Sequence, residues 1–106
     1  MTTFDRREEA FENLFVHDQE MQFKAESLRN KKLAAWAALL MAKAGQDAAA
    51  YEQTIVAFAV EHGGDQAMVE RVRQDLDNAG VPASEAQIRA QMDRLMAEAM
   101  REVRTA

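Results

Sequence analysis

The sequence has no cysteine and little proline, glycine or aromatic content. Its 106 residues include one Pro, four Gly and 7% aromatic side chains. Without Cys there is no disulfide framework and no thiolate metal site, as expected in a reducing compartment. Val and Ile, which favour strands, are few beside Ala and Met. This composition is typical of an all-α protein.

Long hydrophobic runs and positive net charge are also missing. The longest apolar run, LAAWAALLMA, is too short to cross a bilayer, and the N-terminus lacks the pattern of a signal peptide. The net charge of −5 argues against nucleic acid as a partner. We therefore expect a cytoplasmic, soluble protein with no membrane insertion.

The usual tools of catalysis are missing too. The chain has no Gly-rich phosphate loop, no Ser-His-Asp pattern and no Glu-x-x-His motif. In the pairs His17-Asp18 and Glu61-His62 the side chains diverge on a helix and cannot share a ligand. We predict no enzyme, no cofactor and no metal. His17 and His62 are both expected to be surface or boundary residues, and His17 is at most a pH-sensitive element.

Four amphipathic segments are present, at about 4–43, 47–62, 65–79 and 84–103. The expected breaks are Ala44-Gly45, Gly63-Gly64 and Gly80, and the expected N-caps are Asp47, Asp65 and Ser84, the last in a capping box with Gln87. Short loops between four helices predict an antiparallel four-helix bundle. Its expected core is Leu28, Leu33, Trp36, Leu39, Leu40, Tyr51, Ile55, Phe58, Val69, Val72, Leu76, Ile88, Met92, Leu95 and Val103.

The first segment changes character along its length. Phe4, Phe11 and Phe15 fall within about 40° of one another on a helix, with Leu14 beside them, on an otherwise highly charged surface. A broader face follows, at Met21, Ala25, Leu28, Ala35, Trp36, Leu39 and Leu40. We expect an N-terminal arm at 1–19, helical or partly disordered, and a bundle at 20–106 that needs nothing from the arm. Six acids and two arginines give residues 1–20 a net charge of −4, and Lys24, Arg29, Lys31 and Lys32 predict a basic collar behind them.

The N-terminal third carries a family resemblance. Its matching positions are Phe4-Asp5, Arg7-Glu8, Ala10-Phe11-Glu12, Phe15, His17-Asp18, Glu20, Phe23-Lys24-Ala25, Arg29-Asn30 and Trp36-Ala37, joined further on by Gly80-Val81, Ser84-Glu85 and Gln87-Ile88-Arg89. In these positions the chain resembles the zeta-subunit inhibitors of alphaproteobacterial F-type ATP synthases over its whole length.

The resemblance implies a function. In that family the N-terminal helix inserts at a catalytic α/β interface of the ATP synthase head, meets the central rotor subunit and blocks rotation in the ATP-hydrolysing direction. The protein would then be peripheral to the membrane-bound enzyme and monomeric when free. Helix-in-groove binding suits the aromatic stripe. The expected partner-binding residues are Phe4, Asp5, Arg7, Glu8, Phe11, Glu12, Leu14, Phe15, His17 and Asp18.

Two alternatives come from other classes. In a homodimeric helical scaffold the two arms would pair with each other, but Asp18 and Gln22 interrupt the heptad after about two repeats. In a ligand-binding bundle a nucleotide or other small molecule would occupy a polar pocket near the Gly63-Gly64-Asp65 loop, which is the one feature that supports this reading.

Overall fold

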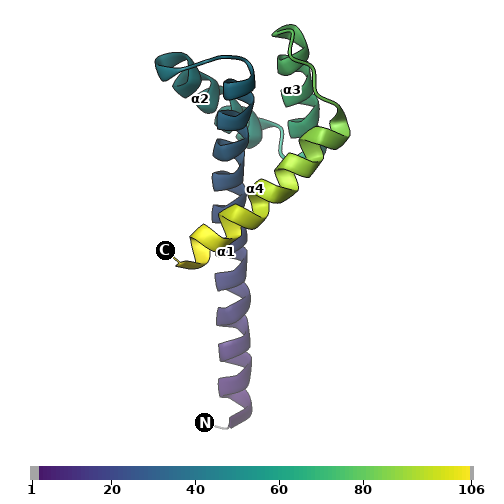
Figure 1. The fold of residues 1–106 in the computed structure, drawn as a ribbon. Helices are drawn as coiled ribbons and strands as arrows, with labels where there is room; N and C mark the ends of the chain where they lie inside the picture. Colours follow the sequence, from purple (N-terminus) through teal and green to yellow (C-terminus); the bar gives the residue numbers. More distant parts are fainter. Residues whose placement is uncertain (1–2, 106) are drawn as a thin grey trace.

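The computed structural model describes residues 3–105 of the chain, and the side chains of residues 18–105. The described part is all-α, as predicted, and has four helices (Figure 1). They are α1 (Thr3–Leu40), α2 (Gly45–Glu61), α3 (Asp65–Asn78) and α4 (Glu85–Thr105). The predicted arm is the N-terminal end of α1.

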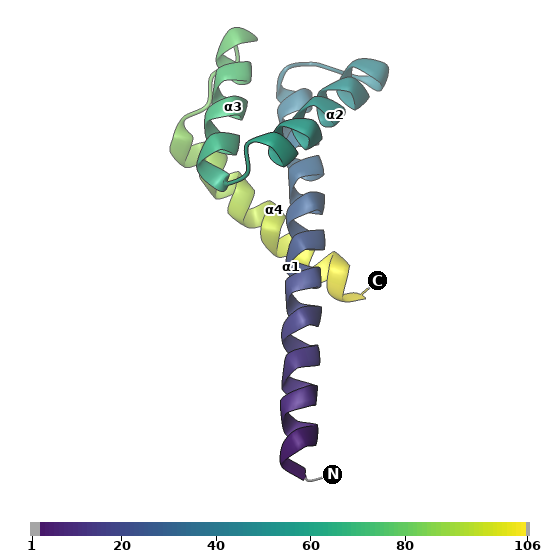
Figure 2. The same cartoon turned by 180° about the vertical axis from the view of Figure 1, so that it is seen from behind.

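Successive helices run in opposite directions and form a four-helix bundle around one half of α1. Helix α4 runs obliquely across α1, while α2 and α3 lie at the end of α1 remote from the N-terminus (Figures 1 and 2). Helix α1 packs mainly against α4 and α2, and α3 packs mainly against α4. The N-terminal half of α1 extends past the other three helices, which gives the molecule extents of 64 × 26 × 24 Å.

Small side chains form much of the face of α1 that the bundle covers. Its buried apolar residues are Ala25, Leu33, Ala34, Ala37 and Ala38. Alanine lets the neighbouring backbones approach closely, so the larger side chains of the core come mostly from the other helices. Buried there are Tyr51, Ile55, Met68, Val69, Val72, Leu76, Ile88, Met92, Leu95 and Ala99.

The buried face predicted for residues 21–40 of α1, which we call the stem, was partly wrong. Leu39 is 76% exposed and Leu40 is 40% exposed, and Ala35 is also exposed. Periodicity allowed a face through the large leucines, but the neighbouring helices pack against the alanine-rich side. Ala79, the last residue of the third predicted segment, is exposed because it follows the last residue of α3.

Two predicted helix boundaries are confirmed in detail. The backbone N–H of Gln87 donates to Ser84 Oγ (3.1 Å), and the N–H of Ser84 donates to Gln87 Oε1 (2.8 Å), which completes the capping box of α4. At the end of α3, Gly80 has a φ of 77° and the N–H of Val81 donates to the carbonyl of Leu76 (3.0 Å). This is a Schellman motif with Gly80 as the left-handed residue.

Three other predicted boundaries were wrong. Helix α1 ends in a Schellman motif whose left-handed residue is Ala42 (φ 59°). The N–H of Lys43 donates to the carbonyl of Ala38 (2.8 Å), and the N–H of Ala42 donates to the carbonyl of Leu39 (3.1 Å). Gly45 instead starts α2, and its N-cap is Ala44. The predicted caps Asp47 and Asp65 both lie within the first turn of their helices, where a carboxylate still favours the helix dipole.

The left-handed conformation of Ala42 predicts a stabilising substitution. A Cβ disfavours this conformation by about 1 kcal/mol, so Ala42→Gly should raise the free energy of unfolding by roughly 0.5–1 kcal/mol. Gly80→Ala is the matched control, because nothing lies within 4 Å of the Cβ it would add and the cost is one of backbone conformation alone. Urea unfolding followed by circular dichroism measures both. A destabilised Ala42→Gly chain would contradict the assignment of this motif.

Candidate functional site

The ten predicted partner-binding residues all lie in the N-terminal half of α1. The side chains of Phe4, Phe11, Phe15 and the other positions up to His17 lie outside the described residues. Asp18, whose side chain is described, is exposed. For the positions up to His17 only the backbone of α1 is described, and the roles of all ten residues stay predictions.

The helical register relates the aromatic stripe to the bundle. At 100° per residue, positions 4, 11 and 15 share a sector of about 80° with positions 25, 29 and 33. Residues 25, 29 and 33 are buried beneath the other helices. Because α1 is one helix from residue 3 to residue 40, the stripe lies on the side of α1 that the bundle covers further along.

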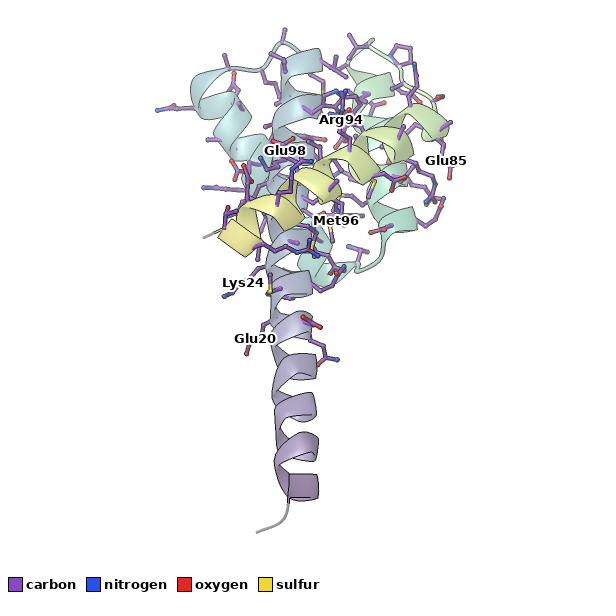
Figure 3. The ribbon with its side chains drawn as sticks, turned by 60° about the horizontal axis from the view of Figure 1, so that its bottom comes forward. Glu20, Lys24, Glu85, Arg94, Met96 and Glu98 are labelled. Atoms are coloured by element: carbon purple, nitrogen blue, oxygen red, sulfur yellow. The ribbon has the colours of Figure 1, made fainter. Side chains whose placement is uncertain are left out.

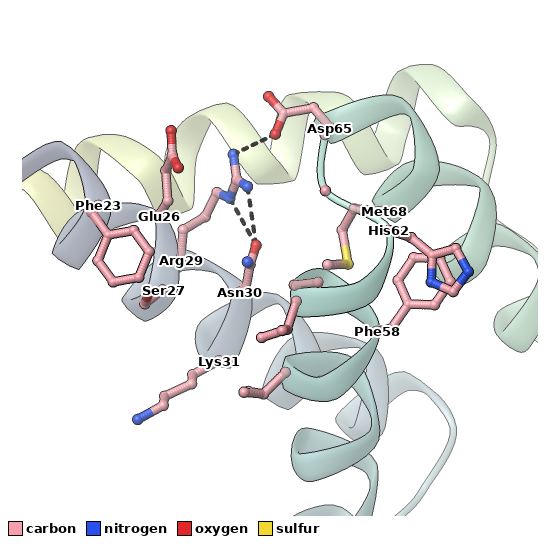
Figure 4. A pocket seen from close by; sticks show the side chains of 15 residues that line it. Phe23, Glu26, Ser27, Arg29, Asn30, Lys31, Phe58, His62, Asp65 and Met68 are labelled. Atoms are coloured by element: carbon pink, nitrogen blue, oxygen red, sulfur yellow. Dashed lines mark hydrogen bonds and ion pairs between the residues drawn. The ribbon is translucent and has the colours of Figure 1, made fainter. Parts of the chain in front are cut away.

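A buried guanidinium holds α1 where it enters the bundle. Arg29 is 7% exposed, and its Nη1 lies 3.0 Å from Oδ1 of Asp65, the first residue of α3. Its Nε and Nη2 donate to Asn30 Oδ1 at 3.2 and 3.0 Å. A buried charge is tolerated only when it is paired and hydrogen-bonded, and Arg29 satisfies both conditions. We call the turn of α1 around residues 29–32 the root of the arm. The Arg29–Asp65 pair ties this root to the α2–α3 junction (Figure 4).

A second ionic contact ties α1 to the end of α4. Lys32 Nζ lies 2.9 Å from Glu98 Oε1 and 3.1 Å from Glu102. The bond from Lys32 holds the pKa of Glu98 below its usual range, and the bonds from Glu98 and then Glu102 raise the pKa of Lys32. Figure 3 shows Glu98 on α4 where that helix crosses α1, with Glu20 beyond the other helices.

These two contacts correct the predicted basic collar. Arg29 and Lys32 are neutralised by acids of α3 and α4, while Lys24 and Lys31 are exposed. Sequence alone could not show which cations of α1 would meet acids 36 to 70 residues away. The collar is therefore reduced to two exposed lysines.

A cleft of about 280 Å³ opens beside this root, between α1 and the end of α2 (Figure 4). The Gly63-Gly64-Asp65 loop lines it, as the hypothesis of a ligand pocket supposed, but so do the apolar side chains of Val56, Ala59 and Met68. The guanidinium at the cleft already pairs with Asp65. Phe23 and Val60, which also line this cleft, were not predicted as site residues, because periodicity does not reveal which side of a helix stays uncovered.

His62, predicted to lie at the surface, is exposed and stacks on Phe58 with the ring centroids 4.5 Å apart. The guanidinium of Arg71 lies 5.3 Å from the same ring. Arg71 also pairs with Asp75 at 3.0 Å, and Asp75 accepts a hydrogen bond from the Tyr51 hydroxyl at 2.9 Å. Burial, helped by Asp75, raises the pKa of Tyr51. This cluster joins α2 to α3, which is a structural role.

The described residues also bear on two other kinds of feature, a metal site and a membrane span. Within them no cluster of three His, Asp or Glu side chains has the geometry to bind a metal ion. Nor does the described part include a helix that is long and apolar enough to span a membrane.

The comparisons with known proteins identify the family. The family model described as "ATPase inhibitor subunit zeta" matches residues 1–102. The chain belongs to this family. The resemblance in the N-terminal third is thereby confirmed, and the match extends to residue 102, within α4. Searches of curated proteins and of solved structures found no significant match.

In this zeta-family chain, the contact between Lys32 and α4 predicts a pH-dependent stability. Because the pKa of Glu98 is lowered in the folded state, its contribution is present above the unfolded pKa of about 4.5 and is lost as the pH falls through the folded value. Lys32→Met should therefore lower the melting temperature at neutral pH and have little effect in acid. Lys24→Met is the control on an exposed lysine of the same helix. An equal loss at both pH values would show that packing of the lysine stem, not the ion pair, is responsible.

Proposed function

We propose that this chain inhibits the ATP synthase by inserting the N-terminal end of α1 at a catalytic α/β interface of its head and contacting the central rotor subunit. Rotation in the hydrolysis direction would then be blocked. Membership in a family of inhibitor subunits supports inhibition of the ATP synthase and a regulatory, non-catalytic role. The site of insertion is inferred from the resemblance and from the form of α1.

The observation that carries this proposal is the extension of α1 beyond the bundle. Three helices pack on its C-terminal half, and the part that precedes them continues as the same helix to Thr3 (Figure 1). A projecting amphipathic helix is suited to a groove between subunits. Phe4, Phe11, Leu14 and Phe15 would be the apolar anchors.

Charged residues would set the register of the inserted helix. The charged positions near the stripe are three acids and one arginine (Asp5, Arg7, Glu8 and Glu12), and His17 and Asp18 would lie near the mouth of the groove. Complementary charges in the groove would favour one depth and one orientation of the helix. The bundle would stay outside and the free protein would be a monomer, peripheral to the membrane-bound enzyme.

The proposed division into an arm (1–19) and a bundle (20–106) predicts that the bundle folds alone. The described core begins at Ala25 and draws its large side chains from residues 33 to 95. A chain lacking residues 1–19 should keep its helical circular dichroism and a cooperative melt, within about 1 kcal/mol of the parent's stability, and should not inhibit. Loss of cooperative unfolding would place the arm in the core.

The aromatic stripe predicts which substitutions abolish inhibition. Phe11→Ala or Phe15→Ala would remove a buried aromatic anchor and weaken binding by about 2–4 kcal/mol, or roughly 30- to 1,000-fold. Inhibition of ATP hydrolysis by the isolated head, titrated with each variant, measures the loss. Melting curves should be unchanged.

Glu9→Ala is the control for the stripe. Glu9 lies on the opposite side of the helix from Phe11, so its loss should change binding by less than about 1 kcal/mol. If Glu9→Ala fails to inhibit while Phe11→Ala inhibits normally, the groove reads the charged side of the helix and the anchor assignment is wrong.

A further inference from the structure

The cleft at the root of the arm has an unusually apolar mouth for a surface feature. Phe23 on α1 is 70% exposed and Val60 near the end of α2 is 84% exposed, and both line the cleft. Behind them are the half-buried Ala59 and the buried Met68. Figure 4 shows Phe23 at one edge of the cleft and Met68 at its inner side. An exposed aromatic beside an apolar hollow is typical of protein-binding surfaces.

The position of the cleft relates it to the arm. At 1.5 Å per residue, Phe23 lies about 12 Å along the α1 axis from residue 15 and about 7.5 Å from residue 18. A groove that holds residues 4–18 therefore has its mouth within two turns of Phe23. Because α2, α3 and α4 surround α1 just above this level, the rim of the groove must face the underside of the bundle.

The rim would meet a particular set of charges. Arg29 and Asp65 neutralise each other at the cleft, whereas Lys31 at its edge is exposed and has no ion-pair partner among the described residues. Glu26, also exposed, lies on the same stretch of α1. The exposed charges at the cleft are one of each sign, so its apolar lining is the surface that an apolar side chain would fit.

We propose that this cleft is a second contact for the protein that holds the arm, and that it receives an apolar side chain from the rim of that protein's groove. The inference rests on the proposed function, since the same partner occupies both sites. Burial of Phe23 and Val60 would extend the interface from the stripe to the bundle. The bundle is then part of the recognition surface as well as the carrier of the arm.

Phe23→Ala tests the proposal, with Leu39→Ala as the matched control. Both residues are large, apolar and at least 70% exposed on α1, but Leu39 lies roughly 24 Å further along the helix, away from the arm. Binding to the purified ATP synthase head should weaken about tenfold or more for Phe23→Ala and less than twofold for Leu39→Ala. Melting temperatures should match the parent, because neither side chain is buried.

Val60→Lys is a second, independent variant. A lysine near the C-terminus of α2 is favourable for the helix, so the fold is preserved, but it places a charge in the mouth of the cleft. It should also weaken binding about tenfold. Equal losses for Leu39→Ala would show a general effect of surface apolarity and overturn the proposal.

Phe11→Ala separates the failure of this inference from the failure of the proposed function. If Phe11→Ala loses inhibition while Phe23→Ala and Val60→Lys bind like the parent, the interface ends at the arm and only the inference falls. If the parent chain does not inhibit the head at all, both fall. Weakening by Phe11→Ala, Phe23→Ala and Val60→Lys together, with Leu39→Ala unaffected, supports both.

Discussion

The packing of three helices against one half of α1 is the constraint on which the rest of the molecule depends. Alanines on α1 allow close approach of α2 and α4, and the two ionic contacts, Arg29 with Asp65 and Lys32 with Glu98, fix α1 where it leaves the bundle. Since both contacts are made within one turn of α1, the helix emerges in a defined direction. The register of the stripe relative to the bundle follows from that fixed root.

Local signals in the sequence predicted much of this fold. The capping box at Ser84, the glycine stop at Gly80 and the apolar stripe of α4 each depend on residues within four positions of one another, so the sequence contains all the information they need. The C-terminal boundary of α1 was harder to predict. An alanine in the left-handed conformation at position 42 has no compositional signal, whereas the nearby Gly45 does.

The errors and omissions at the candidate site come from tertiary contacts. Periodicity placed Leu39 in the core and said nothing of Phe23, because the covered side of α1 is decided by where α2 and α4 lie. It also assigned Arg29 and Lys32 to an open basic surface, when their partners come from distant segments. The aromatic stripe was visible in sequence because charged residues surround it.

The fixed root also changes the energetics of the arm. A separate peptide of about 17 residues must nucleate its own helix, which is unfavourable by a factor on the order of 10³. In the full chain the stem of α1 already provides the nucleus, so each residue of the arm extends an existing helix and adds one backbone bond. The conformational entropy lost when a groove binds the arm would then be smaller than for the separate peptide. Under the proposed function, the bundle would strengthen binding in two ways, by holding the first turns of the arm in helical form and by presenting the cleft beside Phe23 to the same partner.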